Sequence, residues 1–277
     1  MKKTFAFLIL LLFCISCATK RNVVRQFDEV YLDQKRNREV PVSFYVPLDK
    51  VQKKRKVVIF SHGYSKNQPG ANKEYSYLTN ALAKNGYFVV SIQQELPTDD
   101  LLPMEGKPQI VRRSNWERGA DNIQFVLSQL KDKFSYLDYS KVIISGHSNG
   151  GDQSVLFTEK NPEKVWKLIT LDQRRYAFPR VSQPKIYSLR SSDQPADEAV
   201  LPTAEEQEKL RMTIIKLPNT IHNDMDDDGN DEQKQEIINY FFEFLKKNNI
   251  SFIDKIHRLK IDKQKINNEF CNLKKVN

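Results

Sequence analysis

Short and nearly continuous apolar runs recur along the middle of the chain. They occupy residues 57–60, 87–91, 142–145, 168–171, 186–189 and 212–217. Runs of this kind predict strands that are covered on both faces. Segments with helical spacing of apolar residues lie between them, at 73–84, 115–130, 149–159, 204–210 and 231–248. This alternation predicts an α/β fold with a mostly parallel central sheet, right-handed crossovers and helices on both faces.

Two earlier segments, 27–33 and 39–46, alternate apolar and polar residues instead. The polar residues 34–38 connect them, and Pro41 lies in the second segment. Because proline cannot donate a hydrogen bond to a neighbouring strand, it suits the edge of a sheet. We therefore expect an antiparallel hairpin at the N-terminal edge.

The helix over 115–130 has the clearest apolar stripe of the chain. Ser114 and Glu117 precede and open it with the spacing of a capping box, in which each side chain bonds the backbone N–H of the other residue. The pattern predicts that this helix begins directly after Ser114.

The first residues have the composition of an export signal. A basic start is followed by the apolar run 5–15, which is too short to span a bilayer. Residues 14–17, Cys-Ile-Ser-Cys, resemble a bacterial lipobox, with Cys14 at the position where leucine is usual. We expect a signal peptide over 1–16, a lipid anchor on Cys17 and an exported lipoprotein of the bacterial cell envelope. A soluble secreted or periplasmic chain, or an uncleaved anchor, is the alternative.

The composition excludes several classes of protein. The 277 residues are 39% hydrophobic, with only 9 Gly and 12 Pro, which excludes a collagen-like, low-complexity or multi-span membrane chain. No repeat or linker divides the sequence, so we expect one domain over 17–250. The formal net charge is +9, and residues 251–277 form a basic amphipathic extension that could lie on an anionic membrane or pack on the domain. Nucleic acid is not an expected partner, because no recognition motif is present.

The chemistry begins with Gly146-His147-Ser148-Asn149-Gly150, between a predicted strand and a predicted helix. A G-x-S-x-G sequence in that position is typical of a nucleophile elbow, a turn so tight that a Cβ atom at Gly146 or Gly150 would clash. The strained turn exposes the hydroxyl group of Ser148 above the sheet. We expect Ser148 to be the nucleophile.

An oxyanion hole needs two backbone N–H groups near that hydroxyl. Asn149, directly after the nucleophile, can supply the first from the start of a helix. The loop Ser61-His62-Gly63-Tyr64 follows an earlier strand and can supply the N–H of Tyr64, with Gly63 allowing close approach. The ring of His62 is expected to be structural.

The general base must be one of four histidines. His62 and His147 precede the nucleophile or adjoin it, and His257 lies beyond the last predicted helix. His222 follows the strand at 212–217, where its imidazole can reach Ser148. For the carboxylate that orients it, Asp193 after the strand at 186–189 is the first choice, and Asp172 after the preceding strand is the alternative.

These segments resemble the α/β-hydrolase superfamily, in its esterase, lipase and acyl-hydrolase branch, over about residues 57–245. The resemblance implies an acyl-enzyme on Ser148 that is hydrolysed by water activated by His222. It implies neither a cofactor nor a metal. Only residues 172–184 separate two predicted strands where many lipases insert a cap, so we expect an open site without a large cap domain.

The substrate is expected to be a small-molecule or lipid ester, with a serine peptidase or amidase, or a non-catalytic binding lipoprotein of this fold, as alternatives. The segments 93–113 and 172–184 are the two predicted walls of the site, and they carry Arg112, Arg113, Arg174, Arg175 and Arg180. They could favour an acidic or phosphate-bearing ester, or be solvated charges. Residues 224–229 resemble the opening of a calcium loop, but its twelfth position is Gln235 rather than glutamate.

Overall fold

A computed structural model of the chain describes residues 23–48 and 54–246. Its centre is an eight-stranded sheet in the order β1-β2-β4-β3-β5-β6-β7-β8. The pairs β1–β2 and β2–β4 are antiparallel, and every pair from β4–β3 onward is parallel. The strands are β1 (Val24–Asp33), β2 (Arg38–Pro47), β3 (Lys56–Ser61), β4 (Phe88–Ile92), β5 (Asp138–His147), β6 (Val165–Leu171), β7 (Lys185–Arg190) and β8 (Thr213–Lys216). The predicted α/β class, the mostly parallel sheet and the hairpin at its edge are confirmed.

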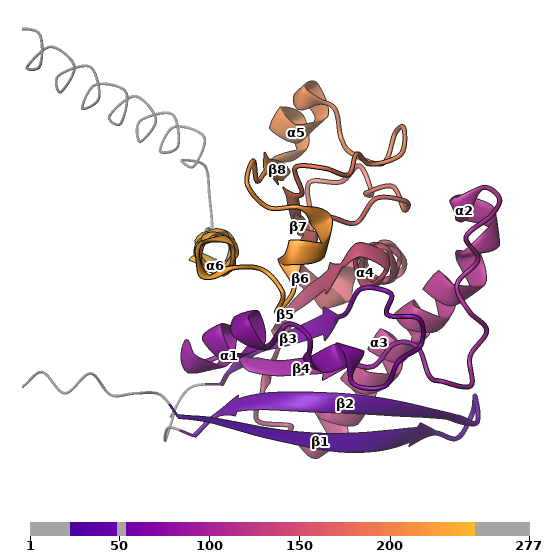
Figure 1. Ribbon diagram of the computed structural model, residues 1–277. Coiled ribbons are helices and arrows are strands. Elements are labelled where there is room, and N and C mark those ends of the chain that lie inside the picture. Colours follow the sequence, from indigo (N-terminus) through magenta and orange to yellow (C-terminus); the bar gives the residue numbers. More distant parts are fainter. Residues whose placement is uncertain (1–22, 49–53, 247–277) are drawn as a thin grey trace, which may run out of the picture.

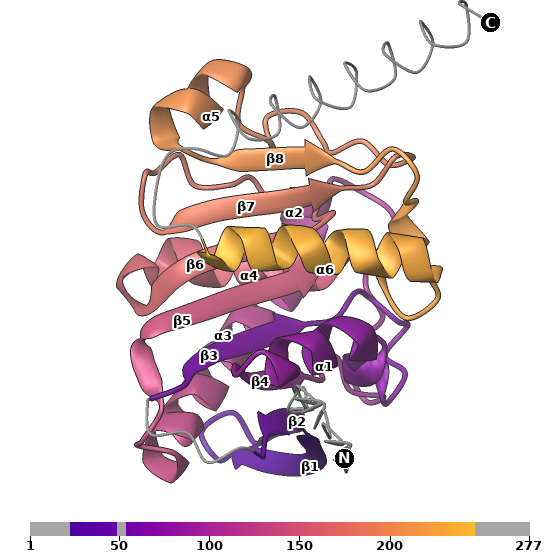
Figure 2. The same cartoon turned by 90° about the vertical axis from the view of Figure 1, so that its left-hand side faces the viewer.

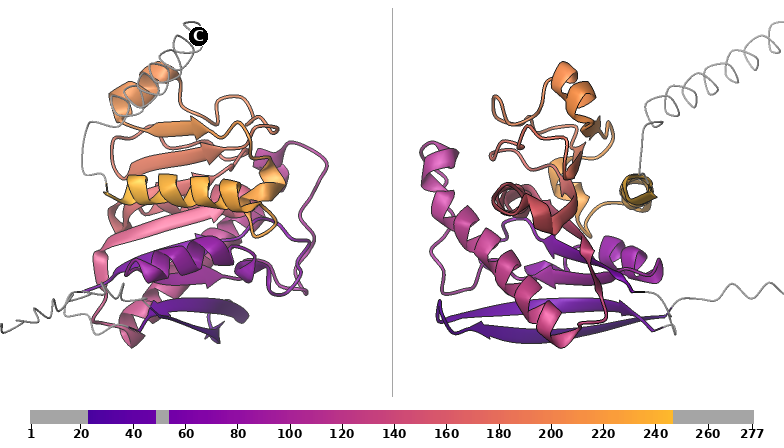
Figure 3. Two further views of the ribbon diagram at one scale, coloured as in Figure 1. Left: turned by 60° about the vertical axis from the view of Figure 1, so that its left-hand side comes forward. Right: turned by 180° about the vertical axis from the view of Figure 1, so that it is seen from behind.

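The helices cover both faces of this sheet (Figures 1 and 2). They are α1 (Ser76–Lys84), α2 (Pro108–Val111), α3 (Arg113–Lys133), α4 (Ser148–Lys160), α5 (Ala204–Leu210) and α6 (Asp231–Lys246), with short 3₁₀ turns η1 (Ala71–Lys73), η2 (Pro162–Lys164) and η3 (His222–Met225). Helices α1 and α6 lie on one face, and α3 and α4 lie on the other (Figure 3). None of the helices in the described part of the chain is long and apolar enough to cross a bilayer.

Each face of the sheet has its own apolar core. On the α3 and α4 side, Trp116 and Leu156 are fully buried against the strands. On the opposite side, Phe241 and Leu78 fill the space under α6 and α1. Strands whose side chains are buried on both faces read as continuous apolar runs, which is why the sequence located them well.

Helix α3 begins earlier than predicted. Its first residue is Arg113, so Ser114 lies within the helix, and no side chain caps its N-terminus. The capping box proposed for Ser114 and Glu117 is therefore wrong, because Glu117 instead pairs with Arg113 one turn before it. A complete capping box does occur at α5, between Thr203 and Glu206.

The connections at the carboxyl ends of the parallel strands carry the site. Residues 172–184, between β6 and β7, contain no helix or strand and form no cap domain. The long connection from β4 to α3 contains only the single turn α2. The expected signal peptide, Cys17 and the extension over 251–277 lie outside the described residues.

Candidate active site

The turn between β5 and α4 holds Ser148 in a strained conformation. Its φ angle is +49°, in the left-handed region that non-glycine residues rarely adopt. A Cβ atom on Gly146 would lie 2.4 Å from the carbonyl oxygen of Gly150, and one on Gly150 would lie 2.2 Å from that of His62. Only glycine at both positions lets the helix approach the strands this closely, so the elbow depends on them.

This packing gives a stability prediction. We expect Gly150→Ala to cost about 3 kcal/mol or more, because the added methyl group meets backbone atoms that cannot turn away. Gly86→Ala is a matched control: its φ is +92°, but the nearest atom is 3.9 Å away, so only the strain of about 1 kcal/mol remains. Urea unfolding of both variants measures the difference. Equal costs would show that the elbow can relax around a methyl group.

Three residues from three different loops meet above this turn. The Nε2 atom of His222 lies 2.9 Å from the Oγ atom of Ser148. On the other side of the ring, Nδ1 of His222 lies 2.5 Å from Oδ2 of Asp172. Ser148 opens α4, Asp172 follows β6, and His222 opens η3, so parallel strand ends bring them together. An imidazole held between a hydroxyl and a buried carboxylate can accept the hydroxyl proton.

Asp172, and not Asp193, is the carboxylate on the imidazole ring, so the first choice from the sequence is corrected. Asp193 is exposed, and its Oδ1 atom accepts the backbone N–H of His222 at 2.8 Å. It fixes the loop rather than the ring. Asp172 reaches the ring because it leaves β6 with a φ of +47°, which the strand pattern of the sequence does not reveal.

Asp172 is held as an anion. Its side chain is fully buried, and burial raises its pKa, but the hydrogen bond to His222, the charge of Arg190 and the bonds from Ser191 lower the pKa to about 2. The Nη2 atom of Arg190 lies 2.8 Å from Oδ1 of Asp172. The carboxylate can therefore stabilise a positive charge on the imidazole at any pH near neutrality.

The loop after β3 presents the second predicted backbone donor. The backbone N–H of Gln94 donates to Nε2 of His62 at 3.0 Å, so the proton of this ring is on Nδ1. Nδ1 lies 2.6 Å from the carbonyl oxygen of Gly63 and donates to it. In a trans peptide the next N–H, that of Tyr64, points the opposite way. His62 thus has the structural role that was expected, and it fixes the orientation of the Tyr64 N–H.

Asn149 begins the other donor segment, where the first amides of a helix have no intrahelical acceptor. Its side chain is tied into a buried polar network. The Nδ2 atom donates to Glu95 at 3.0 Å and to Asn115 at 2.8 Å, while Trp116 donates to its Oδ1 at 2.9 Å. This network fixes the start of α4, and it could not be predicted from the sequence because its members are scattered along the chain.

Tyr75 and His147 lie beside these residues, and neither of them was predicted from the sequence as a site residue. The Tyr75 hydroxyl accepts the N–H of Gly63 at 3.0 Å and forms a hydrogen bond of 2.7 Å with Nδ1 of His147. Burial, and next to it the ring of His222, hold the pKa of His147 well below its usual value. His147 is therefore a neutral ring packed 4.6 Å from that of His222.

Comparison with known proteins rests on structure. No family model and no curated protein matches the sequence. The solved structure of a fungal esterase from Rhizomucor miehei superposes with a TM-score of 0.60 at 13% identity, over 82% of this chain and 84% of that one. An esterase from Pyrobaculum calidifontis gives 0.56 at 13% identity, over 78% and 81%. The chain has the α/β-hydrolase fold.

An acylaminoacyl peptidase from Pyrococcus horikoshii shares this α/β-hydrolase fold, with a TM-score of 0.59 at 15% identity. The match covers 86% of this chain but only 44% of that one. At such low identities the likeness concerns the fold, and the reaction must be argued from the site.

A cavity of about 320 Å³ opens above Ser148. Ser148, His222, Tyr64 and Tyr75 all line it. A volume of this size admits a small ester. The arginines of the two predicted walls do not line this cavity, and three of them contact carboxylates instead: Arg113 contacts Glu117, Arg175 contacts Asp197 and Arg180 contacts Glu206.

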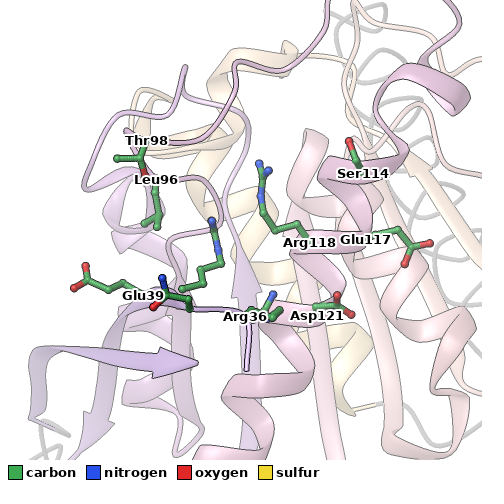
Figure 4. A pocket seen from close by; sticks show the side chains of 10 residues that line it. Arg36, Glu39, Leu96, Thr98, Ser114, Glu117, Arg118 and Asp121 are labelled. Carbon is green, nitrogen blue, oxygen red and sulfur yellow. The ribbon is translucent and has the colours of Figure 1, made fainter. Parts of the chain in front are cut away.

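A second cavity, of about 650 Å³, lies between the β1–β2 turn and α3 (Figure 4). Its arginines already have carboxylate partners: Arg38 contacts Asp99 at 2.7 Å and Arg36 contacts Asp33 at 2.5 Å. No imidazole of the described chain lines it that could activate the hydroxyl groups of Thr98 and Ser114. The chemistry therefore belongs to the smaller cavity.

Proposed function

We propose that the protein is a serine hydrolase that cleaves carboxylic esters through an acyl-enzyme intermediate. The observation that carries this proposal is the chain of contacts from Ser148 through His222 to Asp172, at the wall of an open cavity. The open site without a cap domain and the esterase neighbours in structure favour an ester substrate.

In the first step, His222 accepts the proton of Ser148 as its oxygen attacks the ester carbonyl. The negative charge that develops on the carbonyl oxygen is stabilised by the N–H groups of Tyr64 and Asn149. His222 then gives its proton to the leaving alcohol. Water repeats the sequence on the acyl-enzyme and frees Ser148, while Asp172 holds the imidazole in the tautomer with its proton on Nδ1.

A fluorophosphonate probe, together with a panel of substrates, tests the reaction. We expect the probe to label one residue, which peptide mass spectrometry would locate at Ser148. We expect hydrolysis of short-chain p-nitrophenyl esters at rates well above those of matched peptide anilides. Faster cleavage of the anilides would identify a peptidase or amidase, and a folded protein without labelling would identify a binding protein.

For the cellular location we propose export with a lipid anchor on Cys17. The support is the sequence of residues 1–17 alone. Such an anchor would keep the domain at a membrane surface, with access to small-molecule or lipid esters. The mass of the N-terminal peptide of the mature protein tests this proposal.

A further inference from the structure

The cavity above Ser148 is strongly acidic on one side. Besides the reacting residues, its lining contains the four carboxylates of Glu74, Asp226, Asp227 and Asp228. This is unexpected in a chain whose formal net charge is +9. The local charge of the site is thus opposite to that of the whole protein, and it acts on any group that enters next to the nucleophile.

No lysine or arginine of the described residues forms an ion pair with these four carboxylates. Lys234 approaches most directly, but its Nζ atom donates to the backbone oxygen of Asp227 at 2.6 Å. Lys73, beside Glu74, pairs with Asp28 at 2.6 Å instead. The carboxylate of Asp227 accepts the N–H groups of Ser76 and Tyr77 at the start of α1. Backbone N–H groups thus bind part of this wall, but no cationic side chain of the described residues neutralises its charge.

The pKa of Asp226 reflects this accumulation of negative charge. Burial raises the pKa of its carboxyl group, and the neighbouring charges of Asp228, Glu74 and Asp227 raise it further, to about 6. A cation entering the cavity would relieve this repulsion. Carboxylates that crowd together beside a nucleophile without a cationic partner are typical of a binding site.

His147 gives a second and independent indication that a polar ligand enters. It lines the same cavity and is only 4% exposed, and its Nε2 atom has no hydrogen-bond partner among the described residues. Nδ1 lies 2.7 Å from the Tyr75 hydroxyl, so Nε2 is the nitrogen of this ring that is left without a partner. Buried polar atoms rarely remain unpaired, so this one points to a polar ligand in the cavity.

The acidic wall does not have the arrangement of a metal site. Within the part of the chain that the structure describes, no group of three or more His, Cys, Asp or Glu side chains is placed to hold a metal ion. Asp224, the first residue of the calcium-like sequence, bonds Gln233 at 2.9 Å. Without such a group, these carboxylates suit an organic cation better than a metal ion.

We infer that the preferred substrate is an ester carrying an ammonium group, which the wall of Glu74, Asp226, Asp227 and Asp228 attracts while Ser148 attacks the carbonyl. This inference rests on the proposed ester hydrolysis. The ammonium group can belong to the alcohol or to the acyl part, since the cavity lining does not distinguish the two. The arginine-based expectation of an acidic ester is replaced, because those arginines lie outside this cavity.

The test compares pairs of substrates that differ only in charge. One pair is acetylcholine, the acetic ester of choline, and its neutral isostere, in which a carbon atom replaces the ammonium nitrogen. The other pair has p-nitrophenyl as the leaving group and carries the trimethylammonium group, or its tert-butyl isostere, on the acyl chain. For at least one pair, we expect kcat/KM to be about tenfold higher for the cationic member, and we expect this ratio to fall with added salt.

The variants remove or reverse the charge at exposed positions. Glu74→Gln with Asp228→Asn is expected to lower the cation-to-isostere ratio about tenfold, since each exposed carboxylate contributes modestly. Asp228→Lys changes the local charge by the same two units at one position and should lower the ratio by a similar factor. Glu39→Gln, an exposed charge at the second cavity, is the matched control and should leave the ratio unchanged. Thermal unfolding of each variant verifies that it is folded.

The outcomes separate this inference from the proposed function. If the neutral isosteres are hydrolysed as well as the cationic esters, or an anionic ester is preferred, the inference is overturned while the hydrolase stands. If no ester is hydrolysed and Ser148 is not labelled, the proposed function fails as well. A ratio that the double variant leaves unchanged would show that the preference, if present, does not come from this wall.

Discussion

Replacing Ser148 with alanine is expected to lower kcat/KM for ester hydrolysis by about 10⁵- to 10⁶-fold. The hydroxyl is the atom that would form the acyl-enzyme, and no neighbouring side chain on the cavity can take its place. The fold should remain, because alanine keeps the backbone strain of this position and removes only the Oγ atom, whose hydrogen bond is the one to His222. Ester hydrolysis and fluorophosphonate labelling measure the loss, and urea unfolding verifies the fold.

The double variant Ser148→Ala with His222→Ala makes this prediction sharper. Residues that act as one unit have non-additive effects, so the double variant should be no slower than the single one. Ser128→Ala, at a serine of α3 that bonds Phe125, is the control and should retain full activity. Independent, additive losses would contradict a shared catalytic unit.

Most of the fold could be predicted from the sequence because the sheet is buried on both faces. The apolar runs located β3 to β8 within a few residues, and α5 was found with its observed bounds. The start of α3 was missed because an N-cap must be the last residue before the helix. Arg113 is already helical, so Ser114 cannot be the cap. Local patterns predict where elements lie better than where they end.

Part of the site, too, could be predicted from the sequence, and part could not. Ser148 and His222 could be found because the elbow sequence and the order of the loops constrain them. The acidic partner could not be decided, since both Asp172 and Asp193 follow strands next to one another in the sheet. The choice depends on a single backbone angle, the φ of +47° at Asp172, and on Arg190 and Ser191, which arrive from β7 and the residue after it. Contacts between separate strands have no signature in one sequence.

Replacing Asp172 with asparagine is the second large effect that we expect, and the same replacement of Asp193 is its control. Asp172→Asn should lower kcat by about 10⁴-fold, because an amide in this position no longer stabilises the charged imidazole or its tautomer. Asp193→Asn should lower it by about tenfold at most, since an amide oxygen can still accept the backbone N–H of His222. Steady-state kinetics on one ester compares the two variants. A larger loss for Asp193→Asn would restore Asp193 as the orienting acid.

Stability gives a second measure of Asp172, independent of activity. Its loss leaves Arg190, which is only 5% exposed, with an unpaired charge, so Asp172→Asn should cost about 3 kcal/mol at neutral pH. The pKa of Asp172 is lowered from its usual 3.8 to about 2 in the folded protein. The stabilisation by its ionised form is therefore complete above about pH 4 and is lost as the pH falls through 2. The stability difference between wild type and variant, from urea unfolding, should be constant near neutrality and shrink between pH 4 and pH 2. A difference that persists at the lowest pH would mean that the variant is destabilised by altered packing rather than by the lost charge.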